Sequence, residues 1–87
     1  MNNRLTDRER EHLGRVKELP CSVCDMEGPS EAHHAQQGQQ YTAIALCPPC
    51  HRGPIGWHGT KALWRIRKLD ELGALNITLD RLMRELA

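Results

Sequence analysis

Four cysteines and four histidines between residues 21 and 58 carry the groups of this chain that could do chemistry. The cysteines form two Cys-x-x-Cys pairs, at 21–24 and 47–50, with residues 25–46 between them. Two such pairs from distant segments can direct four thiolates at one zinc ion, which prefers tetrahedral ligation. We therefore predict a structural Zn²⁺ that contributes on the order of 10 kcal/mol to folding, bound by Cys21, Cys24, Cys47 and Cys50.

The cysteine pattern allows two other interpretations. A thioredoxin-type redox pair would need a strand and helix around the motif, and that context is missing. The segment Cys47-x-x-Cys50-His51 also has the form of a c-type haem attachment site, but neither an export signal nor an axial ligand is evident. Zinc binding is the interpretation that uses all four sulfurs.

The histidines suggest a second site. Neighbouring residues on a strand point to opposite sides, so one ring of His33-His34 could bind a metal while the other acts as a base. His51 directly follows the second cysteine pair, which would fix its position, and Trp57 could pack against the core and aim His58. The alternative is that these histidines only complete or buttress the zinc site.

Positive charge is concentrated around this second site. No acidic residue lies between Glu31 and Asp70, and the same window holds five basic residues. A nucleic-acid backbone would be attracted to such a window, although a solvated basic helix face is the simpler alternative. We predict nucleic-acid contacts from Lys61, Arg65, Arg67 and Lys68.

Length and composition restrict the class of protein. At 87 residues with no Phe, the chain predicts one small domain that needs a metal or a disulfide for stability. No apolar run approaches the roughly 20 residues of a membrane helix, and the charged first residues do not resemble a secretory signal. We therefore expect a cytoplasmic protein with no membrane partner, where Cys-x-x-Cys pairs bind metals.

The elements divide the chain into an N-terminal helix at 1–19, a zinc-knuckle core at 20–59 and C-terminal helices at 60–87. Thr6 and Glu9 form a capping box, and Pro20 ends the first helix. A strand is predicted over 41–46. A further helix should follow Gly59 and end at Gly73, and Asn76 or Thr78 should cap a last helix that directs Leu79, Leu82, Met83 and Leu86 inward.

Four motifs follow one another along the chain: Cys21-x-x-Cys24, His33-His34, Cys47-x-x-Cys50-His51-Arg52 and His58. Their order resembles that of the zinc-knuckle branch of the HNH nucleases, most of all its small phage-type, Ref-like proteins. The match covers about residues 20–60. It implies an α+β fold, a zinc-stabilised ββα-metal core related to the treble clef, with flanking helices. It also implies metal-dependent hydrolysis of DNA phosphodiester bonds.

The resemblance also implies roles for individual residues. His33 and His51 would bind the catalytic divalent ion, and His58 is the candidate third ligand. His34 would be the general base that activates water, and Arg52 would contact a phosphate oxygen. Thr42 stands near the position where many members of the family have the Asn that holds the base.

Two functions remain open from the sequence. The first is an HNH-type DNA endonuclease whose catalytic metal is Mg²⁺, Mn²⁺, Ni²⁺ or Zn²⁺. The second is a non-catalytic zinc module that binds nucleic acid or a protein partner, with structural histidines. In either case the leucine-rich C-terminal helices could support a homodimer.

Overall fold

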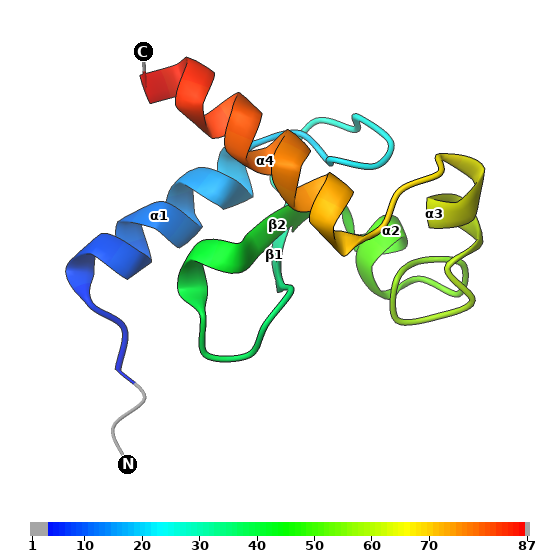
Figure 1. Ribbon diagram of the computed structural model, residues 1–87, viewed down its shortest axis with the longest axis horizontal. Helices are drawn as coiled ribbons and strands as arrows, with labels where there is room; N and C mark the ends of the chain where they lie inside the picture. Colours follow the sequence, from blue (N-terminus) through cyan, green and yellow to red (C-terminus); the bar gives the residue numbers. More distant parts are fainter. Residues whose placement is uncertain (1–3, 87) are drawn as a thin grey trace.

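A two-stranded antiparallel sheet and four α-helices make up residues 4–86, the part of the chain that the computed structural model describes (Figure 1). The predicted α+β class is confirmed. The strand predicted over 41–46 begins two residues later along the chain, at Ala43. In chain order the elements are α1 (Asp7–Glu18), β1 (Glu31–His34), a 3-10 turn (Gln40–Thr42), β2 (Ala43–Leu46), α2 (Pro48–Arg52), α3 (Ala62–Ile66) and α4 (Glu71–Leu86).

The hairpin of β1 and β2 is the centre of the fold. Its register pairs Glu31 with Leu46 and His34 with Ala43. All four residues of β2 are buried, whereas His33 is the one buried residue of β1. An uninterrupted apolar run suits a strand that is covered on both faces, and β2 is packed against both α1 and α4.

Helix α1 begins with the predicted capping box. The backbone N–H of Glu9 donates to the Thr6 hydroxyl at 3.1 Å, and the backbone N–H of Thr6 donates to the Glu9 carboxylate at 2.8 Å. Both groups satisfy N–H donors that a helix start leaves unpaired. The other end of α1 inserts Val16 and Leu19 into a buried cluster with β2 and α4.

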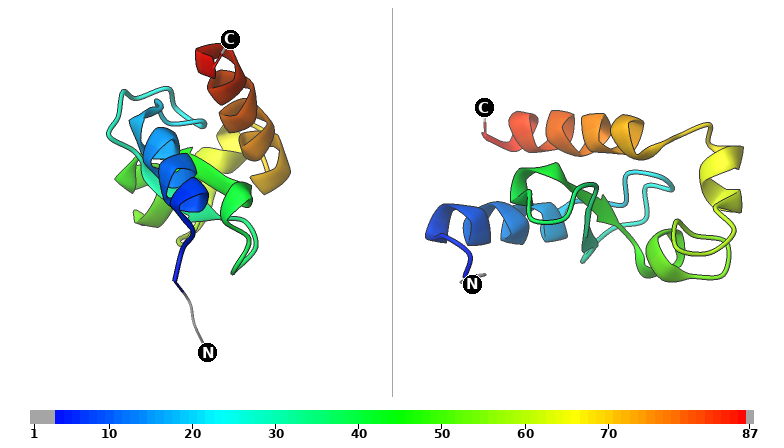
Figure 2. Two further views of the ribbon diagram at one scale, coloured as in Figure 1. Left: turned by 90° about the vertical axis from the view of Figure 1, so that its left-hand side faces the viewer. Right: turned by 60° about the horizontal axis from the view of Figure 1, so that its bottom comes forward.

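Helix α4 forms a layer that runs above α1 and the hairpin (Figure 2). It starts at Glu71 and includes Gly73, so the predicted helix end at Gly73 is wrong. The reason is Asp70, whose carboxylate accepts from the Gly73 N–H at 2.7 Å and caps α4 at an earlier point. The preceding helix, α3, is accordingly only five residues long.

The predicted inward face of the last helix is also largely wrong. Helix α4 buries Ala74, Thr78 and Leu82, which follow one another at four-residue intervals. Thr78 is therefore not a cap. Its hydroxyl lies 2.7 Å from the Ser22 hydroxyl, a contact that ties α4 to the first cysteine turn.

The opposite face of α4 leaves four large apolar side chains exposed: Leu72, Leu79, Met83 and Leu86. The predicted homodimer stays a prediction, since the structure holds a single chain. Among residues 4–86, no helix has both the length and the apolar character needed to cross a bilayer.

Candidate metal centres

The sulfurs of the four cysteines converge where the turn after α1 meets the start of α2. One sulfur from each of Cys21, Cys24, Cys47 and Cys50 lies within 4.8 Å of the others, and all four thiols are free. The sulfurs of Cys24 and Cys47 are 3.6 Å apart. Zinc–sulfur bonds of about 2.3 Å place tetrahedral sulfurs about 3.8 Å apart, so this cluster could hold a metal ion, as predicted.

Local backbone contacts set the two cysteine turns. In the first turn, the N–H of Asp25 donates to the Cys21 carbonyl at 2.9 Å, and the N–H of Ser22 donates to Ala45 of β2 at 2.9 Å. In the second, Cys47 is the N-cap of α2 and two prolines follow it, where their fixed φ favours a helix start. Both pairs are therefore attached to the hairpin.

Burial makes ionisation of Cys47 and Cys50 unfavourable in the absence of a cation. It raises the pKa of Cys47 to about 11 and also raises the pKa of Cys50. Burial likewise opposes ionisation of Cys21, but backbone N–H groups near its sulfur prevail and lower its pKa. Because thiolates are the ligating form, metal binding must release protons and must weaken as the pH falls.

The second centre consists of His33 on β1, His51 on α2 and His58 in the turn after α2. One ring nitrogen from each lies within 4.8 Å of the others, and Nδ1 of His33 is 3.2 Å from Nε2 of His51. His33 is buried, His51 is half-buried and His58 is exposed. The structure therefore brings together the three predicted metal ligands.

Each of the two more buried rings has its outer nitrogen against a carboxylate. Nδ1 of His51 is 2.8 Å from Glu31, and Nε2 of His33 is 2.6 Å from Glu71. An ionised carboxylate only accepts hydrogen bonds, so these two ring nitrogens carry the hydrogens. The inner nitrogens then present lone pairs to each other at 3.2 Å, an arrangement that is favourable when a cation lies between them.

The donor chemistry fits a divalent ion. Metal–nitrogen bonds of about 2.05 Å place two tetrahedral ligand atoms about 3.3 Å apart, close to the 3.2 Å between His33 and His51. Burial lowers the pKa of His33 despite the opposing hydrogen bond to Glu71. The ring is therefore neutral at neutral pH, which is the form that binds metals.

Glu31 connects His51 to the neighbouring Arg52. The Nε of Arg52 donates to the two carboxylate oxygens at 3.0 and 2.9 Å. These contacts, followed by the hydrogen bond from His51, lower the pKa of Glu31 to about 2. Sequence reasoning missed Glu31, although its place two residues before His33 puts both on one face of β1.

The turn formed by residues 53–60 folds back on α2 and places His58. The N–H of Trp57 donates to the Cys50 carbonyl at 2.8 Å, and the N–H of His58 donates to the His51 carbonyl at 3.0 Å. The Trp57 ring packs on Trp64 with centroids 4.7 Å apart. As predicted, Trp57 packs against the core and so orients the histidine beside it.

Gly56 is one of three glycines in this turn where a side chain cannot fit, together with Gly53 and Gly59. A Cβ at Gly56 would lie 2.7 Å from the Cys50 carbonyl oxygen and would collide with the backbone of Pro49. We expect Gly56→Ala to lower the free energy of unfolding by about 1–3 kcal/mol and to weaken metal binding by displacing His58. Urea denaturation and nickel titration measure the two effects.

Gly14 provides the matched control. A Cβ at Gly14, on α1, meets nothing within 4 Å, so Gly14→Ala should raise stability by up to about 1 kcal/mol through helix propensity. If Gly56→Ala is as stable as Gly14→Ala and binds nickel normally, the turn does not constrain His58.

His34 lies outside the three-histidine cluster. Its Nε2 is 2.6 Å from the side-chain oxygen of Gln40, so Nε2 donates its hydrogen and Nδ1 keeps a lone pair. Thr42 instead donates to the Gln39 carbonyl at 2.8 Å and shapes the loop. The sequence assigned no residue to hold His34, because Thr42 stands where an Asn was expected. The structure gives this contact to Gln40, which no sequence signal separates from its neighbouring glutamines.

The predicted nucleic-acid contacts lie on and around α3, at the end of the molecule that also holds α2 (Figure 1). Arg65, Arg67 and Lys68 are exposed, and the Lys61 ammonium lies 4.8 Å from the Trp57 ring centroid. None of these four residues forms an ion pair with a carboxylate of residues 4–86. Their charges are available to an anion.

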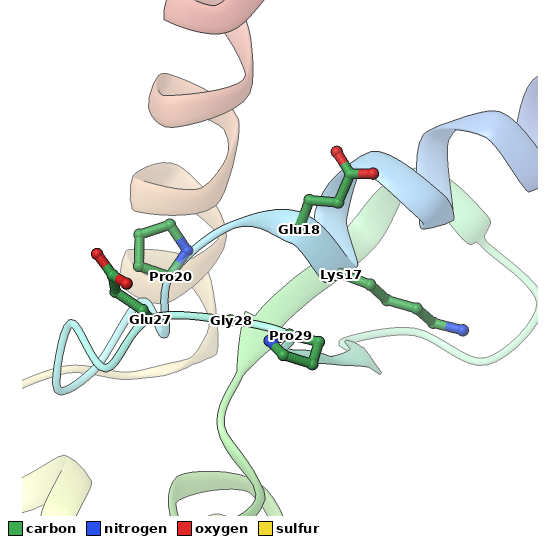
Figure 3. Close-up of a pocket in the computed structure, with 6 residues that line it drawn as sticks. All are labelled: Lys17, Glu18, Pro20, Glu27, Gly28 and Pro29. Carbon is green, nitrogen blue, oxygen red and sulfur yellow. The ribbon is translucent and has the colours of Figure 1, made fainter.

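A separate surface pocket of about 510 Å³ lies between the end of α1 and residues 27–29. Figure 3 shows that the side chains of Lys17, Glu18 and Glu27 extend in different directions around it. Polar groups that converge on one point characterise ligand sites, and this pocket lacks them. None of the cysteines or clustered histidines lines it.

Comparisons of the chain with protein families, with curated proteins and with solved structures find no match.

Proposed function

We propose that this protein is a metal-dependent endonuclease of the HNH type that hydrolyses DNA phosphodiester bonds. In this proposal β1, β2 and α2 form the ββα-metal core, and the four cysteines hold a structural zinc ion. The main support is the pair of inner nitrogens of His33 and His51, 3.2 Å apart, with each outer nitrogen against a carboxylate. His34 is the next residue on β1, and its Nδ1 has no hydrogen-bond partner among residues 4–86.

In the proposed reaction, the metal ligands and the general base would have separate roles. A divalent ion bound by His33, His51 and His58 would stabilise charge on the phosphate and on the leaving oxygen. His34 takes a proton from the attacking water through Nδ1 while Gln40 holds the ring. The water oxygen bonds to phosphorus as the bond from phosphorus to the leaving oxygen breaks.

Arg52 and the basic residues around α3 would bind the substrate. The Arg52 side chain is 65% exposed although it is paired with Glu31, so it can also approach a phosphate oxygen. Lys61, Arg65, Arg67 and Lys68 would contact the sugar–phosphate backbone, which positions a duplex without reading its sequence. Binding should therefore weaken as the salt concentration rises.

A plasmid cleavage assay tests the proposal. We expect the purified protein to nick or cut supercoiled DNA with Mg²⁺, Mn²⁺ or Ni²⁺ and to be inactive in EDTA. His33→Ala and His51→Ala should lower the rate by about 100-fold or more, because metal stabilisation of the transition state supplies several kcal/mol. His12→Ala is the matched control, since His12 lies on α1, packs beside Tyr41 and belongs to neither centre.

The absence of metal-dependent cleavage, or equal rates for wild type and His33→Ala, would contradict the proposal. The non-catalytic zinc module would then be favoured. It predicts one metal ion per chain by elemental analysis, whereas the endonuclease predicts two when the protein is loaded with nickel.

A further inference from the structure

Glu71, at the start of α4, contacts the histidine centre, although the three histidines themselves come from β1, α2 and the turn after α2. Its carboxylate lies 2.6 Å from Nε2 of His33, a residue 38 positions earlier in the chain. The side chain of His33 is 7% exposed and that of Glu71 is 30% exposed. The contact is therefore largely shielded from water, and a hydrogen bond to an ionised acceptor in such surroundings is strong.

The position of Glu71 is fixed by the way α4 begins. Glu71 is the first residue of the helix, and Asp70 caps it through the 2.7 Å bond from the Gly73 N–H. Three residues later Ala74 is fully buried in the cluster that also contains Cys47 and Cys50. The carboxylate is thus presented by a helix end anchored beside both centres.

The contact decides which nitrogen of His33 is available. With the hydrogen held on Nε2 by Glu71, the lone pair is on Nδ1, the atom that faces His51. Without that acceptor the ring could carry its hydrogen on either nitrogen and could rotate about its side-chain bonds. A histidine ligand whose other nitrogen is held by a carboxylate binds metal more tightly, commonly by 10–100-fold.

We propose that Glu71 is a positioning residue of the three-histidine centre, which holds Nδ1 of His33 toward the metal and couples metal binding to the docking of α4. The inference rests on the proposed metal site. Because coupling between two events is reciprocal, metal binding should also protect the first turn of α4 from hydrogen exchange.

Nickel titration of protein that carries one zinc ion tests this proposal. We expect Glu71→Ala to raise the nickel Kd by about 10–100-fold and Glu71→Gln to raise it less, because the amide oxygen still accepts from Nε2. Glu85→Gln makes the same charge change at an exposed site on α4 and should leave the Kd unchanged. Nitrogen-15 spectra should show the His33 hydrogen on Nε2 in the wild type. In Glu71→Ala they should show a mixture of the two neutral tautomers, with the hydrogen on Nε2 in one and on Nδ1 in the other.

A purely structural role of Glu71 predicts a different pattern. Glu71→Ala would then lower the melting temperature with an unchanged nickel Kd and an unchanged His33 tautomer, and this result would overturn the inference. Val16→Ala, which truncates a buried side chain of α1 in the other core cluster, should show that pattern. If Glu71→Ala does not fold, the nickel Kd of Glu71→Gln decides, because the proposal expects this Kd to rise and a purely structural role leaves it unchanged.

The titration also separates this inference from the proposed function. If the wild type binds nickel, His33→Ala loses it and Glu71→Ala keeps the wild-type Kd, the metal centre stands and only the role of Glu71 is wrong. If the wild type binds no second metal, both are overturned.

Discussion

Cys50→Ser is expected to unfold the domain at room temperature, and zinc removal from the wild type by a strong chelator should do the same. Structural zinc contributes on the order of 10 kcal/mol to small domains, which is comparable with the whole stability of about 5–15 kcal/mol that folded proteins have. Circular dichroism and zinc content measured on the same samples check the result.

The composition of the core explains the size of this effect. One of the two buried clusters contains Cys21, Cys47 and Cys50 beside Trp64 and a few aliphatic residues. Without a cation, these sulfurs are small apolar groups that pack weakly. Since burial raises the pKa of Cys47 to about 11, protons compete with zinc as the pH falls, and a given chelator concentration should unfold the protein more readily at pH 6 than at pH 8.

Val23→Ala provides the control for lost packing. Val23 is buried in the same cluster, so its truncation should cost about 1–3 kcal/mol while the protein keeps one zinc ion. A Cys50→Ser protein that stays folded without zinc, and melts close to the wild type, would show that the cysteines are not a structural metal centre.

His34→Ala is expected to lower the rate of DNA cleavage by about 100- to 10,000-fold, the usual contribution of a general base, without changing metal affinity. We expect an unchanged metal affinity because His34 is not one of the three clustered histidines. Single-turnover cleavage of a plasmid and nickel titration measure the two properties separately.

Gln40 allows a finer test of the same role. Gln40→Ala removes the acceptor 2.6 Å from Nε2 of His34, so the ring loses its preferred tautomer and the rate should fall by about 10-fold or more. Gln37→Ala changes an exposed glutamine of the same loop and should have no effect. Equal rates for His34→Ala and the wild type would exclude His34 as the base, and a loss of nickel binding in His34→Ala would make it a ligand.

Much of the local structure followed from sequence signals that operate over a few residues. The capping box of Thr6 and Glu9 and the end of α1 before Pro20 formed as predicted. The apolar strand β2 also formed, although it begins two residues later than predicted. The last two helices did not, because Asp70 caps α4 earlier than Asn76 or Thr78. Leucine spacing predicted that the helix was amphipathic, but Ala74, Thr78 and Leu82 became its buried face.

The sequence by itself determined which residues could ligate metals. A Cys-x-x-Cys turn brings two sulfurs together through backbone geometry alone, so Cys21, Cys24, Cys47 and Cys50 could be identified without a fold. The resemblance of the motif order to the HNH nucleases implied that His33, His51 and His58 share a metal, and the structure assembles these three histidines into a cluster.

Only the tertiary structure decided how the histidines are held. The partners Glu31, Gln40 and Glu71 come from the hairpin, its loop and the start of α4, and each contact depends on how separate elements pack. A hydrogen bond acts over about 3 Å and in one direction, whereas a sequence pattern fixes only which face of an element a residue occupies. The choice of ring nitrogen therefore came from packing, and the sequence contains no short-range signal for it.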